Sequence, residues 1–119
     1  MGFARRQRLT RSLDLQNVIR EGKRLRTVHL DVRVLASPLT VSRVGIVVPR
    51  HQRSAVDRNK LKRRLRELVR VELLPALRCR PAVDVSVRAR REAYDASFDA
   101  LRRDVRVARA RLVIDETQA

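Results

Sequence analysis

The chain has 119 residues, which suits one domain and is enough to bury a single core. It carries 29 Lys and Arg residues against 13 Asp and Glu residues, and the resulting net charge of +16 is spread along the whole sequence. Such an excess indicates a polyanionic partner, with nucleic acid favoured over an anionic membrane surface. No apolar run of about 18 residues is present, so we expect neither a membrane span nor a secretory signal.

The N-terminal region predicts a basic arm followed by a short helix. Residues 1–11 hold four arginines, and we expect a flexible arm that orders on binding. Ser12 is suited to cap a helix that runs to Arg20 or Glu21, and Gly22 is suited to the position after its end. Helical spacing places three side chains on its apolar edge: Leu15, Val18 and Ile19.

Two strands are expected next. Residues 28–35 alternate, which places Val28 and the apolar residues that follow on one face of a half-buried strand. The β-branched run Val44–Val48 predicts a more central strand, which Pro49 ends. The polar connection between these segments suggests that they pair as an antiparallel hairpin.

The segment Ser54–Leu74 predicts an amphipathic helix over residues 56–73. Ser54 and Asp57 have the spacing of a capping box, and Pro75 disfavours a helical conformation in the residue before it. One edge is apolar and expected to be buried: Leu61, Leu65, Leu68 and Val69. The opposite face is densely cationic with few acids, which favours a polyanionic partner over the alternative, a solvated charged face.

The C-terminal part predicts a third clear strand and a long helix. Alternation places Val83, Val85 and Val87 on one face of the strand. Because a helix separates it from the strand at 44–48, these two strands should pair in parallel. Apolar residues recur at helical spacing from Glu92 to Leu112, and we expect this stripe to be core. Residues 113–119 are expected to form a frayed tail.

The order Arg-Asn-Lys-Leu-Lys-Arg at 58–63 follows a strand that contains Arg43-Val44-Gly45. This arrangement resembles the protein subunit of bacterial ribonuclease P, which carries an Arg-Asn-Arg-x-Lys-Arg-x-x-Arg signature on a helix after such a strand. Lys60 replaces the usual arginine, which keeps the charge but loses bidentate geometry. The resemblance covers about residues 5–112, close to the whole chain.

The resemblance implies one small α+β domain, an α/β sandwich in which three helices pack on a central mixed sheet of about four strands. It also implies a left-handed crossover around the signature helix, against the general right-handed rule. The signature helix is implied to bind a catalytic RNA through six residues: Arg58, Asn59, Lys60, Lys62, Arg63 and Arg66. Further RNA contacts are expected from Arg50, Arg53 and Arg70, which extend the basic patch.

In this family, a groove between the first helix and the sheet receives the single-stranded 5′ leader of precursor tRNA. The resemblance implies that Leu15, Ile19 and Arg33 line it here. Aromatic side chains are common in the groove because bases stack on them, whereas leucine and isoleucine give apolar contact only. The alternative for Leu15 and Ile19 is plain core packing.

No complete active site for cleavage by the protein alone is apparent. His29 and His51 are isolated, the acids lack metal-ligand spacing, and the single cysteine, Cys79, fits a reducing cytosol. The resemblance implies that the RNA subunit and its magnesium ions cleave precursor tRNA to mature its 5′ end. This chain would then be the cytoplasmic accessory subunit, with no membrane, bound metal or obligate protein partner.

Charge and size alone leave other functions open. A structural RNA-binding protein, such as a ribosomal protein, shares both without needing the ordered signature. An architectural protein of double-stranded DNA would bind duplex DNA and structured RNA equally well. A stand-alone nuclease would have to cleave RNA with no RNA partner present.

Overall fold

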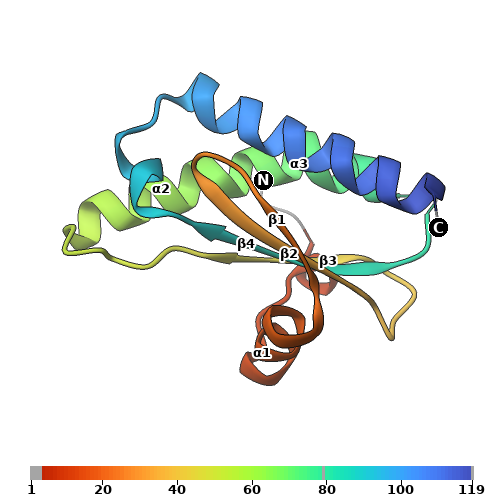
Figure 1. Ribbon diagram of the computed structural model, residues 1–119. Coiled ribbons are helices and arrows are strands. Elements are labelled where there is room, and N and C mark those ends of the chain that lie inside the picture. The colour runs from red at the N-terminus through yellow and green to blue at the C-terminus, as the bar shows by residue number, and fades with distance from the viewer. Residues whose placement is uncertain (1–3, 79, 119) are drawn as a thin grey trace.

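The computed structural model describes residues 4–78 and 80–118, with side chains described as far as Leu112. A four-stranded sheet forms the middle layer, with α1 on one face and with α2 and α3 on the other (Figure 1). The elements in chain order are η1 (Arg5–Gln7), α1 (Ser12–Glu21), β1 (Lys23–Arg26), β2 (Leu30–Ala36), β3 (Arg43–Val47), α2 (Ala55–Leu68), η2 (Val69–Leu73), η3 (Leu74–Leu77), β4 (Val83–Ala89), η4 (Arg91–Asp95) and α3 (Phe98–Gln118). The predicted α+β class, with a mixed sheet and three helices, is confirmed. Cys79, residues 1–3 of the expected arm and the side chains of the expected tail lie outside the described residues.

The strand order across the sheet is β1-β2-β4-β3, so β3 is an edge strand and the more central position predicted for residues 44–48 is wrong. β2 pairs antiparallel with β1 and β4, so the predicted hairpin between β2 and β3 is wrong. β4 lies between β2 and β3. All seven of its residues pair with the seven residues of β2, and this position buries Val85 and Val87 at the centre of the sheet. Alternating apolar residues indicate which face of a strand is buried, but they do not indicate which other strand pairs with it.

The α2 crossover joins β3 to β4, and these strands pair in parallel as predicted. The regular α-helix ends at Leu68, earlier than predicted, and continues as the π-helical η2 and the 3-10 turn η3. Leu74 keeps helical angles, φ −57° and ψ −42°, so the expectation that Pro75 would end the helical conformation before it is wrong. Pro75 lies in the first turn of η3, where no helical hydrogen bond needs its missing N–H.

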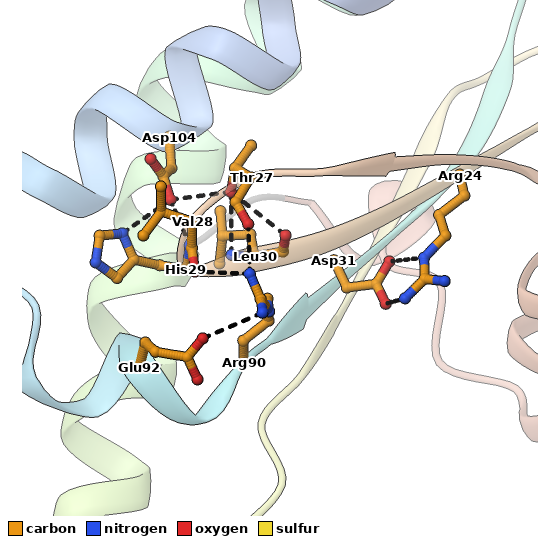
Figure 2. Close-up of polar contacts among 9 residues, drawn as sticks. All are labelled: Arg24, Thr27, Val28, His29, Leu30, Asp31, Arg90, Glu92 and Asp104. Carbon is orange, nitrogen blue, oxygen red and sulfur yellow. Dashed lines mark hydrogen bonds and ion pairs between the residues drawn. The ribbon is translucent and has the colours of Figure 1, made fainter.

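A tight turn, residues 27–29, joins β1 to β2, and Asp104 of α3 holds it (Figure 2). The Asp104 Oδ2 atom accepts hydrogen bonds from the Thr27 hydroxyl at 2.9 Å and the His29 backbone N–H at 2.8 Å, and lies 2.9 Å from His29 Nδ1. Val28 at the tip is 65% exposed, so its predicted place on the buried face of the strand is wrong. The turn is thereby fastened to the helical layer, across 75 residues of sequence.

The first helix, α1, begins at Ser12 and ends at Glu21, close to the predicted bounds. Ser12 is its first residue and Arg11 is the N-cap, so the predicted capping role of Ser12 is wrong. Gly22 has an ordinary φ of −75°. Glycine is needed there because any larger residue would clash: a Cβ would lie 2.4 Å from the Val18 carbonyl oxygen. This close approach lets the chain turn from α1 directly into β1.

The main core lies between the sheet and the layer of α2 and α3. Four residues of the stripe predicted for the last helix are buried in it: Leu101, Val105, Ala108 and Leu112. α3 begins at Phe98 instead of Glu92, because residues 91–95 form the 3-10 turn η4. Ser97 Oγ then accepts a hydrogen bond from the Ala100 N–H at 3.1 Å, which caps the helix start.

Part of the segment expected to be a flexible arm is packed against the sheet. Leu9 is 2% exposed, and its N–H donates to the Val44 carbonyl oxygen at 3.0 Å. Arg8 forms a parallel bridge with Val44, so residues 8–9 extend the outer edge of β3. Gly45 makes room for this packing, since a Cβ there would lie 2.6 Å from the Leu9 carbonyl oxygen.

Candidate nucleic-acid interface

The signature residues lie on α2, which is fixed at its start by Ser54 and along its length by the core. Ser54 Oγ accepts a hydrogen bond from the Asp57 N–H at 3.1 Å, as the capping spacing predicts. The side chains of Leu61, Leu65 and Leu68 are buried, which confirms the predicted apolar edge. The rest of the helix surface is consequently presented outward from a rigid support.

The cations of α2 are largely unpaired. In the part of the chain that the structure describes, five of them make no side-chain hydrogen bond or ion pair: Lys60, Lys62, Arg63, Arg64 and Arg66. Asn59 is exposed beside them. Like charges on neighbouring turns disfavour a helix, and phosphate groups of a nucleic acid would relieve that repulsion. This unpaired cationic surface is the candidate site.

Arg58 combines an outward charge with a structural contact. Its Nε donates to the Val48 carbonyl oxygen at 2.8 Å, which ties the first turn of α2 to the end of the preceding strand. Four N–H groups of the guanidinium remain for other acceptors. Arg58 can therefore position the helix and contact a phosphate at the same time.

The three additional contacts predicted near α2 differ in availability. Arg50 is exposed, whereas Arg53 pairs with Asp95 at 2.8 Å and lies over the Tyr94 ring at 5.2 Å. Arg70 pairs with Glu67 one turn earlier, and its hydrogen bond lowers the pKa of the Glu67 carboxyl. Arg53 and Arg70 would each have to share or exchange an acid partner to contact RNA.

The turn before α2 is held in a specific shape. His51 and Gln52 have φ values of 49° and 66°, a left-handed conformation that non-glycine residues adopt at some cost. The Tyr94 hydroxyl donates to the Pro49 carbonyl oxygen at 2.6 Å, and the His51 ring meets the Tyr94 ring edge-on with centroids 6.4 Å apart. η4 thus braces the turn that sets the start of α2.

A cleft of about 280 Å³ joins α2 to the first helix along the outer edge of β3. Lys62 and Arg66 line it on the α2 side, and Leu15 lines it on the α1 side. The structure therefore brings one predicted groove residue next to the signature. Sequence analysis missed Arg8 and Thr10, which also line the cleft, because both fell in the segment expected to be a flexible arm.

The other predicted groove residues lie further along α1. Ile19 is 38% exposed, and Arg33 donates from Nη1 to the Ile19 carbonyl oxygen at 2.7 Å. Arg33 thereby fastens the end of α1 to β2, and its Nε also lies 3.8 Å from the Asp31 carboxylate. The described aromatic residues, Tyr94 and Phe98, pack against the main core.

The arginine of the Arg-Val-Gly strand has an internal role. Arg43 pairs with the buried Asp84 of β4 at 2.6 Å and with Asp14 of α1 at 3.3 Å. The hydrogen bond to Asp84 raises the pKa of Arg43 above its ordinary value. Arg43 links β3, β4 and α1, which fixes the walls of the cleft.

Among the described residues, no group of three or more His, Cys, Asp or Glu side chains could hold a metal ion. His29 contacts Asp104 and His51 contacts Tyr94, so each described histidine has a local partner. Within the same part of the chain, no helix is long and apolar enough to cross a membrane.

A rigid α+β sandwich that presents an unpaired cationic helix beside a cleft defines a small nucleic-acid-binding protein. The sequence model of the family described as Ribonuclease P matches residues 3–113. The chain therefore belongs to the ribonuclease P protein family.

Individual relatives agree with this assignment. The ribonuclease P protein component of Kocuria rhizophila is 40% identical over 109 residues, which cover 91% of this chain and 93% of that protein. The corresponding component of Syntrophobacter fumaroxidans is 42% identical over 69 residues, 58% of each chain. The solved ribonuclease P protein of Staphylococcus aureus superposes with a TM-score of 0.71 at 26% identity, covering 82% of this chain and 86% of that one.

Proposed function

We propose that this chain is the accessory subunit of ribonuclease P, in which it binds the catalytic RNA through α2 and assists removal of the 5′ leader from precursor tRNA in the cytoplasm. In this proposal the RNA and its magnesium ions carry out the cleavage, and the protein contributes binding, positioning and charge neutralisation. The observation that carries it is the row of unpaired cations on α2, supported by a buried leucine edge. Family membership supports this choice of partner and substrate.

The cleft suggests which residues contact the catalytic RNA and which contact the 5′ leader of precursor tRNA. Lys62 and Arg66 would hold phosphates at its α2 wall, while Leu15 and Gly45 form an apolar wall across from them. Ile19 and Arg33 would extend contact along α1 toward the leader. Because no described aromatic side chain lines the cleft, leader binding would rest on apolar and charged contacts without ring stacking.

The proposal is tested by cleavage of precursor tRNA at low magnesium concentration, with the catalytic RNA of the same organism, the protein, or both. We expect cleavage at the mature 5′ end only when both are present. Failure of the protein to stimulate, with its RNA binding intact, would contradict the proposal and favour a general RNA-binding role.

A paired variant tests the α2 surface. The double substitution Lys62→Gln and Arg66→Gln removes two phosphate contacts, each worth about 0.7–0.9 in the slope of log affinity against log salt. We expect about 10–30-fold weaker RNA binding at 0.15 M salt. The matched control is Arg103→Gln with Arg111→Gln, which removes two exposed charges from α3 and should change affinity much less.

A further inference from the structure

A second depression lies along the same edge of the sheet as the cleft. Its volume is about 300 Å³, and three arginines line it: Arg6 from η1, and Arg78 and Arg80 from the segment after η3. Gln7 of η1 and the hydroxyl-bearing residues Thr40 and Ser42, from the connection between β2 and β3, complete the polar part of its lining. No acidic residue is among its described lining residues.

The two depressions are consecutive. The N-terminal segment contributes Arg6 to the second depression and Arg8 to the cleft, while the β3 region contributes Ser42 and then Gly45. This order is consistent with the parallel bridge between Arg8 and Val44, because both segments then run in the same direction.

The helical segment from α2 to η3 runs in the opposite direction, so it passes the cleft first and the second depression afterwards. It contributes Arg66 to the cleft and Leu74 to the second depression, which are separated by at most about 12 Å, the length of eight residues at the α-helical rise of 1.5 Å. The three residues from Ser42 to Gly45 span about 10 Å of strand. The two estimates agree, so the depressions are neighbours that a few consecutive nucleotides can bridge.

The chemistry of the second depression suits a phosphodiester. Arginine presents a planar fork of donors that matches phosphate oxygens, and hydroxyl groups can donate to the same oxygens. Arg6 and Arg78 are exposed and have no side-chain partner among the described residues, while Arg80 makes a further interaction. A bound phosphate would relieve the repulsion between Arg6 and Arg78, which come from segments 72 positions apart in the sequence.

The geometry points to a second RNA-backbone site at Arg6 and Arg78, into which the strand held by Lys62 and Arg66 continues along the N-terminal segment. This inference rests on the proposed function, since it takes the ligand to be RNA of the ribonuclease P complex. It assigns to residues 6–10 the role of a ridge that the RNA backbone follows between two sites.

The test measures the affinity of the full chain for the catalytic RNA at several salt concentrations. The variant is Arg6→Gln with Arg78→Gln, and the control is again Arg103→Gln with Arg111→Gln. We expect the slope of log affinity against log salt to become shallower by about 1.4–1.8 in the variant, with about 10–30-fold weaker binding at 0.15 M salt. The control should keep a slope close to that of the unmodified protein.

Two further measurements separate the explanations. The charge-preserving variant Arg6→Lys with Arg78→Lys should recover most of the slope, and urea unfolding should show that the Gln variant is as stable as the unmodified protein. Equal slopes for the Gln variant and the control would overturn the second site, and so would a loss of affinity explained by unfolding.

The same experiment distinguishes failure of this inference from failure of the proposed function. If Lys62→Gln with Arg66→Gln reduces the slope and Arg6→Gln with Arg78→Gln does not, RNA binding by α2 stands and the second site is refuted. If the unmodified protein binds the catalytic RNA no better than an unrelated structured RNA, the proposed function itself fails.

Discussion

The contact between Asp104 and the β1–β2 turn gives the sharpest test of how the fold is held. One carboxylate oxygen serves the Thr27 hydroxyl, the His29 backbone N–H and the His29 ring (Figure 2). Asp104 is 7% exposed, so water cannot readily replace it when it is removed. We therefore expect Asp104→Ala to remove the acceptor of two partly buried donors, the Thr27 hydroxyl and the His29 N–H.

The magnitude follows from the donors left behind. A buried donor that loses its partner costs about 1–3 kcal/mol, and the His29 N–H has no second acceptor described. The Thr27 hydroxyl loses less, because it also lies 3.3 Å from the Leu30 carbonyl oxygen. The expected loss in free energy of unfolding is about 2–4 kcal/mol, a large share of the 5–15 kcal/mol typical of a domain.

Urea denaturation followed by circular dichroism measures this loss. With a slope of about 2 kcal/mol per molar urea, the middle of the usual range, the midpoint should fall by about 1–2 M. Asp99→Ala is the matched control on the same helix, since Asp99 is 81% exposed and pairs with Arg102 on the surface. It should cost less than about 1 kcal/mol. A loss below about 1 kcal/mol for Asp104→Ala would refute the reasoning.

Three other substitutions test single features, each by urea unfolding. Gly45→Ala should destabilise the protein by about 1–3 kcal/mol, because the new Cβ would meet the Leu9 backbone oxygen at 2.6 Å. Tyr94→Phe should cost about 0.5–1.5 kcal/mol, since it removes the hydrogen bond that braces the turn before α2. Glu72 accepts a hydrogen bond from Arg106 that lowers its pKa, so its contribution is present above its ordinary pKa of about 4.5 and is lost as the pH falls through the folded value. Glu72→Gln should therefore lower stability at pH 7 and change it much less at pH 3.

Each of these has an outcome that contradicts it. An unchanged unfolding midpoint for Gly45→Ala would mean that the N-terminal segment moves away without cost. For Tyr94→Phe, the same result would show that packing alone braces the turn. A difference between Glu72→Gln and the unmodified protein that is as large at pH 3 as at pH 7 would show that the Arg106 pair is not its source.

Local pattern predicted the elements better than it predicted their arrangement. The apolar edge at Leu61, Leu65 and Leu68 is encoded by spacing and is confirmed. The predicted strand at β4 is confirmed as well, with Val85 and Val87 in the core, although Asp84 and Ser86 on its other face are also buried. The order of strands is set by pairing between segments far apart, which no local window contains. β1 was missed for a related reason, since its sequence Lys-Arg-Leu-Arg offers only Leu25 to the core and depends on β2 for its partner.

The candidate site was predicted in part. Residue order located the signature, and the structure places its cations on one supported helix. The sequence could not show that Arg53 and Arg70 have acid partners, because these contacts depend on chain geometry. It also could not show that Leu9 is buried, since a single apolar residue among arginines has no periodicity to interpret.

The central position of β4 has a consequence for how the protein is made. Synthesis proceeds from the N-terminus, so β3 and α2 are made before residues 83–89. Until β4 inserts, β2 and β3 have no common neighbour, and the leucine edge of α2 has no complete sheet to cover. We expect the nascent chain to expose its most cationic segment, without tertiary support, close to ribosomal RNA. Folding therefore depends on a strand that is made late, and a chain that stops before residue 83 would keep the β1–β2 pair but could not join β3 to it.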